Sequence, residues 1–418
     1  MAHSTGQRVT TPRPRAIVLD PSDNGPGLAR NLRRHGVPVS LLATPTYAWT
    51  TRTRGVDGRA LGALPEETEH WLAVLGQLAE DGEGVLIPAS DAACELVLLN
   101  RGRLPASLRS FESSDSGHSI LMDKASLHEL AARAGVRQPR VIPLRARSQI
   151  DDALAQIELA QIDYPCLLKP ALSHVWRRRF GDDRVIVVDD AASLPAVAAP
   201  ALDAGLELLV SEYIPGPVRN IETAVIVRCR DGTLPLGYTK RKIYQHPELG
   251  AGTLHEICEA PETFALAEQL LEGADFVGLA SVEAKRHAET GEAVLMEANV
   301  RVPQGGFGLG DAAGLDASWR LYAALAGLPL GPQPRPRPRV RQLVATRELE
   351  ALAELSANPR MLLRRFASYR NVRDVSGLDL RDPWLVLSFL GHLARGGLRR
   401  GYRAFSARRA RRRDAKLG

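Results

Sequence analysis

The chain has 418 residues, of which 44% are hydrophobic and 24% are charged, and its formal net charge is +6 at pH 7. This length predicts two or three packed units, and the composition is that of a globular protein. Four cysteines without a CxxC pair argue against a disulfide framework or a zinc cluster. We find no signal peptide and no apolar run near the roughly 20 residues that cross a bilayer. We therefore expect a cytoplasmic protein.

The first part of the chain, residues 15–115, alternates between strand-like and helix-like patterns. Such alternation predicts a parallel sheet with helices on its faces, an α/β arrangement. Residues 1–14 lack the pattern and are expected to be disordered, and Asp91 is expected near the N-cap of the third helix. The predicted strands are 15–20, 37–42 and 85–88, and the predicted helices run from the turn at 24–27 to about 34, over 71–80 and over 91–100.

A second unit, residues 116–330, mixes helices with strands that we expect to pair largely antiparallel, an α+β arrangement. The Asp-Gly pair at 231–232 is a hairpin signal. A Gly-rich loop at 305–310 precedes a last helix that reaches about residue 326. The other predicted helices are 123–134 and 262–271, and the strands are 164–170, 184–188, 206–213, 221–228, 236–243, 277–285 and 293–299.

The C-terminal part begins with a Pro-alternating linker at 331–341, which should be extended and fairly stiff. We expect residues 342–418 to form a smaller, mostly helical region. Residues 395–418 carry nine Arg and one Lys against one Asp, a local net charge of +9 that leaves about −3 for the rest. Three interpretations of this basic tail stay open: a solvated helix end, peripheral contact with an anionic membrane, and nonspecific nucleic-acid binding. We expect no specific nucleic-acid partner.

Polar side chains recur on the last two predicted strands of the second unit. Residues i and i+2 of a strand share a face, so Glu283 points with Lys285 on the first strand. On the second strand, Glu297 points with Asn299 and Arg301. The turn between the strands would bring both carboxylates to one level. Two carboxylates and an amide oxygen match Mg²⁺, which takes few protein ligands and otherwise binds water and phosphate oxygens. The flanking cations could hold a phosphoryl group.

A second interpretation of this pattern is a solvated sheet face with alternating charges, which is common in antiparallel sheets. The Gly-rich loop at 305–310 directly follows the second strand. It favours the metal site, because such a loop can bring backbone N–H groups close to an oxyanion or a phosphate.

Common nucleotide-binding motifs are absent from the sequence. No Gly-Lys dipeptide occurs, which excludes a Walker P-loop, and no GxGxxG follows the first strand, which argues against a dinucleotide site. Only six of the 54 Lys and Arg residues are lysines, and five of them lie between positions 124 and 285. Lys124 and Lys169 are candidates for neutralising phosphate oxygens, and the strand and turn at 211–216 could offer backbone groups to an adenine edge. Taken singly, each could also be an ordinary surface lysine or turn.

In order and spacing, these pieces together resemble the ATP-grasp superfamily. A closer likeness is to D-aspartate ligase and other carboxylate–amine ligases, through residues 86–104 and 238–256. The resemblance covers roughly residues 15–390, and it is the ordered set rather than any one motif that is specific. The motifs are MDK (122–124), YPCLLKP (164–170), LLVSEYIPG (208–216), VEAK (282–285) and MEANVR (296–301).

The resemblance implies a fold and a set of site residues. Residues 15–115 would be a Rossmann-like preATP-grasp domain, and 116–330 a two-lobed ATP-grasp domain with a lid lobe at about 125–212 and a core lobe at about 213–330. The implied ATP contacts are Lys124, Lys169, Ser211, Glu212, Tyr213, Ile214 and Lys285. The implied ligands of one or two Mg²⁺ ions, with Mn²⁺ as an alternative, are Glu283, Glu297 and Asn299. The residues implied in catalysis are Arg301, Lys240, Arg241 and Lys242.

The sequence departs from the pattern of the superfamily at three places. Ser211 occupies a hinge position that is often Glu, and Val300 replaces the usual Pro. The loop after Lys169, at 171–183, is basic rather than Gly-rich, and its arginines at 177–179 could cover the phosphates.

The resemblance predicts that a carboxylate attacks the γ-phosphorus of ATP and that the resulting acyl phosphate passes to an amine. The substrates would be small molecules, with an amino acid or another small carboxylate as the donor. Alternatives are a carboxy- or carbamoyl-phosphate intermediate, a thiol acceptor, or a non-enzymatic ATP-binding scaffold. The oligomeric state stays open, with a dimer as a plausible form, and membrane association would occur through the C-terminus.

Overall fold

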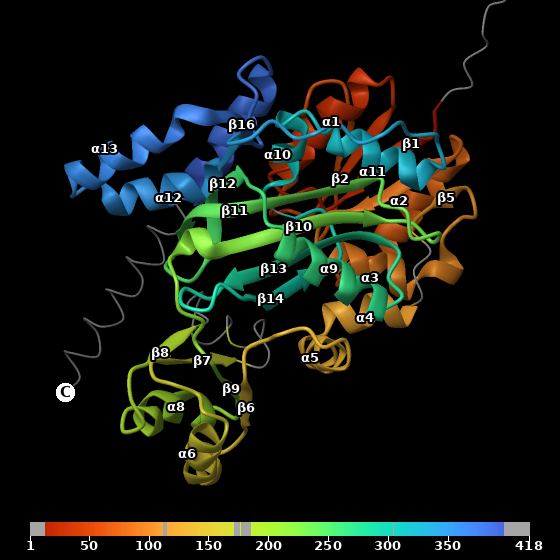
Figure 1. Ribbon diagram of the computed structural model, residues 1–418. Coiled ribbons are helices and arrows are strands. Elements are labelled where there is room, and N and C mark those ends of the chain that lie inside the picture. Colours follow the sequence, from red (N-terminus) through yellow and green to blue (C-terminus); the bar gives the residue numbers. More distant parts are fainter. Residues whose placement is uncertain (1–12, 112–114, 171–175, 177–184, 304, 397–418) are drawn as a thin grey trace, which may run out of the picture.

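The computed structural model describes residues 13–111, 115–170, 176, 185–303 and 305–396 (Figure 1). Its first unit is a five-stranded parallel sheet in the order β3-β2-β1-β4-β5, which confirms the predicted α/β arrangement. The elements are β1 (Arg15–Leu19), α1 (Gly25–Arg34), β2 (Val39–Ala43), β3 (Asp57–Ala60), α2 (Thr68–Glu80), β4 (Gly84–Pro88), α3 (Asp91–Leu99) and β5 (Leu108–Arg109). Strands β3 and β5 escaped prediction because they are short and carry no apolar run.

Helix α3 begins at Asp91, as the sequence predicts, and its N-cap residue is Ser90. The Ser90 hydroxyl, rather than Asp91, accepts the capping hydrogen bond from the amide of Ala93 at 3.1 Å. Asp91 is instead the first helical residue, where its carboxylate is favoured by the positive end of the helix dipole. The carboxylate thereby stays available for a partner from another element.

The core of the second unit is a seven-stranded sheet in the order β14-β13-β10-β11-β12-β15-β16. The first five of these strands pair antiparallel, as the sequence predicts for this unit. Helix α9 packs on one face, together with α4 and α5. The bounds are β10 (Ile221–Arg228), β11 (Leu236–His246), β12 (Ala251–Ile257), α9 (Pro261–Gly273), β13 (Gly278–Arg286), β14 (Ala293–Asn299), α4 (Asp115–Met122) and α5 (Lys124–Arg133).

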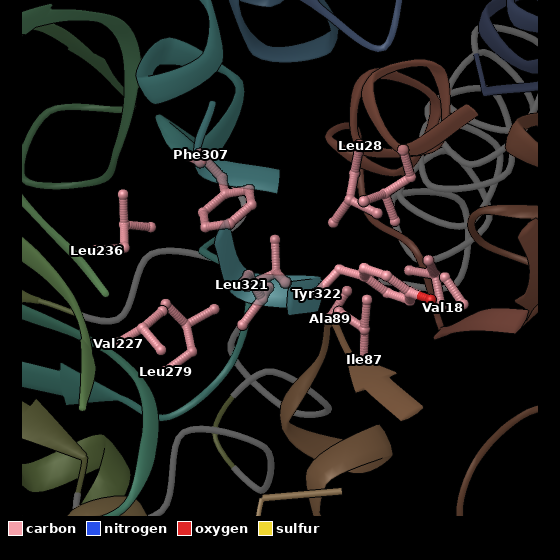
Figure 2. Close-up of a cluster of buried hydrophobic side chains, with 14 of the residues drawn as sticks. Val18, Leu28, Ile87, Ala89, Val227, Leu236, Leu279, Phe307, Leu321 and Tyr322 are labelled. Atoms are coloured by element: carbon pink, nitrogen blue, oxygen red, sulfur yellow. The ribbon is translucent and has the colours of Figure 1, made fainter. Parts of the chain in front are cut away.

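A single apolar cluster joins the first unit to the opposite face of this core sheet (Figure 2). Helices α10 (Phe307–Ala312) and α11 (Ala317–Ala326) lie between the two sheets and supply its centre. The fully buried rings of Phe307 and Tyr322 belong to it. This shared cluster fixes the position of the first unit relative to the core sheet. The other labelled members are Val18, Leu28, Ile87 and Ala89 from the first unit, Val227, Leu236 and Leu279 from the core sheet, and Leu321 from α11.

A small four-stranded antiparallel sheet forms a separate lobe below the core sheet in Figure 1. In the described part of the lobe two helices cover this sheet, and the lobe has an apolar core of its own. It is joined to the rest by the segments before β6 and after β9. The bounds are β6 (Val141–Leu144), α6 (Ile150–Leu159), β7 (Cys166–Pro170), β8 (Ile186–Val188), α8 (Leu194–Asp203) and β9 (Leu208–Ser211).

The C-terminal region is mostly helical, as the sequence predicts, but it also contributes two strands that the sequence did not indicate. Strands β15 (Arg341–Val344) and β16 (Val372–Ser376) extend the core sheet, and β15 pairs with β12. Both strands are short, so the amphipathic helical patterns around them dominate the sequence. The helices are α12 (Ala345–Leu355), α13 (Pro359–Ala367) and residues 383–396. Within the described residues, no helix has both the length and the apolar character needed to cross a membrane.

A buried ion pair ties α12 and α13 to the core sheet. Glu348 and Arg365 are 1% and 7% exposed, and two N–H groups of Arg365 donate to the Glu348 carboxylate at 2.5 and 2.7 Å. The same guanidinium donates to Thr253 on β12 at 2.8 Å and lies over the Tyr244 ring of β11. Burial raises the pKa of Glu348, but the hydrogen bonds from Arg365 and its neighbours outweigh this, so that the pKa lies below its ordinary value.

Replacing Glu348 by Gln should lower the free energy of unfolding by about 3–5 kcal/mol, because it leaves a buried guanidinium without its countercharge. Chemical denaturation at neutral pH measures this. Glu354→Gln is the matched control: Glu354 lies on the same helix with its side chain 75% exposed, and its loss should change stability by about 0.5 kcal/mol or less. Equal effects of the two substitutions would contradict the assignment.

Candidate functional site

The register of β13 against β14 brings the predicted metal ligands onto one face of the core sheet. Glu283 pairs with Glu297, and Ser281 pairs with Asn299. Cross-strand partners in an antiparallel pair share a face. The predicted pairing across the turn is thus present, and the three side chains that could ligate a metal lie at the same end of the sheet. Their role as ligands stays a prediction.

Hydrogen bonds connect these side chains to one another and to β11. Lys242 Nζ donates to Glu283 Oε1 at 2.9 Å, and Asn299 Nδ2 donates to Glu297 Oε1 at 2.9 Å. The Glu297 side chain is exposed, whereas Glu283 is partly covered. The face therefore offers carboxylate oxygens to the solvent side while a lysine partly neutralises one of them.

Arg301 lies between this face and the first unit. Its Nε donates to Asp91 at 2.7 Å, and its terminal N–H donates to Asn299 Oδ1 at 3.1 Å. The strand end that carries the candidate ligands is thereby tied to the N-terminus of α3. Arg301 is positioned by a residue 210 positions away in the sequence.

The donors fit magnesium better than a transition metal. Among the described residues, no group of three or more His, Cys, Asp and Glu side chains is placed to hold a metal ion. Two carboxylates and an amide oxygen are hard oxygen donors, and Mg²⁺ completes its shell with water and substrate phosphates. Glu283, Glu297 and Asn299 would hold such an ion only together with a phosphate ligand.

Two lysines and a histidine extend the same face toward β12. Lys240 and His255 are 4% and 3% exposed, and Lys240 Nζ lies 3.5 Å from His255 Nδ1. Burial lowers the pKa of Lys240 to about 8, and burial with the nearby cations lowers the pKa of His255 well below its ordinary value. The imidazole is therefore neutral at pH 7, and its Nε2 has no hydrogen-bond partner among the described residues. Sequence reasoning missed His255, which occupies the position beside Lys242 on β12.

Arg241 does not share this face. Successive strand residues point to opposite sides, and the Arg241 guanidinium donates to Glu256 at 2.6 and 3.1 Å on the far side of the sheet. Arg341 binds the same carboxylate at 2.6 Å. The expectation that Lys240, Arg241 and Lys242 gather at one place therefore has to be corrected: the two lysines do, and Arg241 stabilises the opposite face.

The predicted Gly-rich loop is shorter than its sequence indicates, because α10 already begins at Phe307. Gly308 and Gly310 are helical, where a side chain would crowd residues of the core sheet. Gly306 has φ +91°, a left-handed conformation that favours glycine. Its amide donates to Gln342 Oε1, so this N–H is committed to the β15 side chain rather than directed at a phosphate.

The predicted hinge connects the small lobe to the core sheet. Lys169 Nζ on β7 donates to Ser211 Oγ at 3.3 Å, and Lys285 Nζ lies 4.8 Å from the centre of the Tyr213 ring. Ile214 is buried. These contacts place predicted nucleotide-binding residues of both lobes next to each other.

The Glu212 carboxylate forms ion pairs with two arginines. Arg137 and Arg140 donate to its carboxylate at 2.9 and 2.8 Å, and the amide of Arg140 donates at 3.0 Å. Burial raises the pKa of Glu212, but these hydrogen bonds outweigh it and lower the pKa to about 2. Any contribution of Glu212 to nucleotide binding would therefore come from its backbone.

Two predicted elements fall at the limits of the described residues. Lys124 is the first residue of α5, after an Asp123 side chain that caps the helix by accepting from Ser126 N at 2.8 Å. The side chain of Lys124 and the loop at 171–183, apart from Trp176, lie outside the described residues.

A pocket that is partly open to solvent lies between the first unit and the core sheet. Its lining is mainly apolar and includes Leu86, Phe111, Leu279 and Leu325. Arg301 reaches it, but none of the candidate metal ligands does. The polar face of the core sheet, rather than this pocket, carries the groups suited to phosphate chemistry.

Several solved structures resemble this chain. N5-carboxyaminoimidazole synthetase from Staphylococcus aureus has a TM-score of 0.62 at 14% identity, covering 83% of this chain and 86% of its own. Biotin carboxylase from Campylobacter jejuni, solved as a β-γ-ATP complex, has 0.59 at 14%, covering 78% and 74%. N5-carboxyaminoimidazole ribonucleotide synthetase from Thermus thermophilus has 0.57 at 20%, covering 78% and 81%. No protein-family model and no curated protein matches the chain.

The chain has an ATP-grasp fold. The likeness extends over 77% to 83% of the chain among the solved structures that resemble it. At this level of identity it establishes the ATP-grasp fold, whereas the chemistry depends on the side chains of this chain.

On the expectation of ATP turnover drawn from the sequence, Gly306→Ala should lower that turnover by about tenfold or more, because a Cβ there would overlap the Lys240 side chain and displace its ammonium group. ADP release measures the effect. Gly291→Ala is the matched control: it has φ +73° and open space around it, so it should cost a similar stability of about 1–2 kcal/mol without loss of turnover. Equal turnover in both variants would show that Lys240 is not needed in its present position.

Proposed function

We propose that this chain is an ATP- and Mg²⁺-dependent ligase that activates a small carboxylate as an acyl phosphate and transfers it to an amine. The observation that carries the proposal is the shared face of Glu283, Glu297 and Asn299, with Lys240 and Lys242 beside it. An ATP-grasp fold supports it, and similar structures were solved with ADP or ATP. The donor set matches a magnesium nucleotide rather than a metal bound by protein alone.

Each lobe would hold a different part of the nucleotide. The strand and turn after β9, up to Ile214, would offer backbone groups to the adenine edge. Lys169 from the small lobe and Lys285 from the core sheet would neutralise phosphate oxygens, and Lys124 would do so from the start of α5. Lys169 and Lys285 both lie at the hinge, as the contacts of Lys169 with Ser211 and of Lys285 with Tyr213 indicate.

The reacting groups would meet at the carboxylate end of the face. Glu283, Glu297 and Asn299 would hold Mg²⁺, which compensates the charge that develops on the transferring phosphoryl group. Lys240 and Lys242 would orient the attacking carboxylate, and Arg301 would steady the acyl phosphate. No nucleophilic side chain is needed, because position and charge compensation lower the barrier. An amine bound from the side of the first unit would then take the acyl group.

A second candidate is formation of a carboxyphosphate from bicarbonate. The names of the similar structures favour it, because N5-carboxyaminoimidazole ribonucleotide synthetase and biotin carboxylase are carboxylating enzymes. The same residues would serve, since bicarbonate and a carboxylate present the same oxygens to Lys240 and Lys242. A thiol acceptor or a purely ATP-binding scaffold has no specific observation in its favour.

Glu297→Gln should reduce ADP release by about 100-fold to 1,000-fold, because it removes a charged ligand of the Mg²⁺ ion that would compensate the charge on the transferring phosphoryl group. Its affinity for Mn²⁺ in the presence of a non-hydrolysable ATP analogue should fall in parallel. Glu289→Gln, an exposed substitution in the turn between the same two strands, should leave both measurements unchanged. Near-normal ADP release by the Glu297 variant would remove the metal assignment.

The two candidate reactions are distinguished by the substrate that triggers ATP cleavage. With bicarbonate as the only added substrate, the carboxylate–amine ligase should release no more ADP than the enzyme with ATP alone. With an amino-acid mixture at saturating concentration, ADP and phosphate should appear in equal amounts. Bicarbonate-stimulated ADP release without amino acids would replace the first candidate by the second.

A further inference from the structure

The helix at residues 383–396 is fixed to the first unit by one of its sides. Leu385 and Phe389 are 0% and 3% exposed, and the Phe389 ring packs edge-on against Trp49, with 5.1 Å between ring centroids. This packing determines the rotation of the helix about its axis. The side chains opposite Leu385 and Phe389 must therefore face away from the protein.

The start of the helix is fixed as well. The Asp382 carboxylate accepts from the amide of Leu385 at 3.2 Å, which caps the helix. Its second oxygen accepts from the amide of Arg54 at 2.6 Å, so the cap also joins the helix to the first unit. The outward side of this helix is thus a defined surface.

Large apolar side chains occupy that outward side. Trp384, Leu387 and Leu390 are 71%, 58% and 53% exposed. Their spacing of three residues places them within about 120° of the helix circumference, on one stripe. We call these three residues the apolar stripe. Single exposed leucines are ordinary on protein surfaces, but a tryptophan and two leucines in one line are not.

All charged side chains in the sequence around the apolar stripe are basic. No Asp or Glu occurs between positions 383 and 413, and residues 395–418 carry a net charge of +9. Tyr402 and Phe405 are interleaved with these arginines. An apolar stripe with a Trp, continued by a dense run of Arg, combines the two attractions by which a segment binds at a lipid–water interface.

We propose that the apolar stripe is a peripheral binding surface for an anionic lipid bilayer, and that the positive charge of the sequence after it makes the binding selective for anionic lipid. Trp384, Leu387 and Leu390 enter the boundary between headgroups and acyl chains, with the helix in the plane of the membrane. The net charge of +9 carried by residues 395–418 favours anionic over neutral headgroups. This surface lies on a different element from the proposed ligase site and does not depend on it.

Two other occupants fit the surface less well. A second copy of this chain would cover the apolar stripe but would bring two tails of charge +9 together, which like-charge repulsion opposes. Nucleic acid would bind the arginines but would leave the apolar side chains in water. Only an anionic lipid surface satisfies both features at once.

The test is co-sedimentation of the full-length protein with vesicles, using equal parts of phosphatidylcholine and phosphatidylglycerol or phosphatidylcholine alone. The wild type should sediment with the anionic vesicles and stay in solution with the neutral ones. Replacing Trp384, Leu387 and Leu390 together by Ser should weaken partitioning to the anionic vesicles by about tenfold or more. Replacing the arginines at 408, 409, 411 and 412 by Gln should weaken it as well, and should reduce its salt dependence.

Leu99→Ser with Leu159→Ser is the matched control, because these leucines are 78% and 85% exposed on other elements. It should bind vesicles as the wild type does, and all variants should keep the wild-type melting temperature because every substituted leucine and tryptophan is exposed. The proposal is overturned if the stripe variant partitions like the wild type, or if the wild type ignores anionic vesicles. It is also overturned if the stripe variant instead converts a dimer to a monomer in sedimentation equilibrium, or if duplex DNA binds where vesicles do not.

Discussion

The two-residue alternation of the core sheet is the constraint on which the rest of the structure depends. On β10 and β13, Ala224 pairs with Val282 toward α9, whereas Thr223 pairs with Glu283 toward the polar face. A slip of one residue in either strand would move every such side chain to the wrong face. Glu283 would then be buried among leucines. The apolar contacts under α9 therefore also determine where the carboxylates of the site lie.

The polar face is held at its other end by the packing against α10. Tyr238, two residues before Lys240 on β11, is buried in the cluster that joins the two sheets and donates to the carbonyl of Gly306 at 2.9 Å. Because β11 is fixed at Tyr238, the position of Lys240 on the polar face is fixed as well. The packing that joins the first unit to the core sheet therefore also positions the buried lysine.

Prediction from sequence succeeded where a pattern is local. The strand pair that carries Glu283 and Glu297 is marked by alternation and by the turn between its strands, so its register could be inferred. The register of strand β12 could not be inferred. Its residues His255 and Glu256 bind partners on different faces of the sheet, and those partners lie elsewhere in the chain. The separation of Arg241 from its neighbours follows from strand alternation alone and was available from the sequence. The positions of the other site residues depend on tertiary contacts and not on local secondary-structure propensity.

The ion pairs of Glu212 have a mechanical consequence. The carboxylate grips Arg137 and Arg140, which precede the first strand of the small lobe, while Glu212 itself follows the last strand. These ion pairs therefore hold together the segment that enters the small lobe and the segment that leaves it. The two segments cannot separate without breaking these ion pairs, which limits the directions in which the small lobe could move relative to the core sheet. Any such movement would carry Lys169 with the lobe, because Lys169 lies on β7.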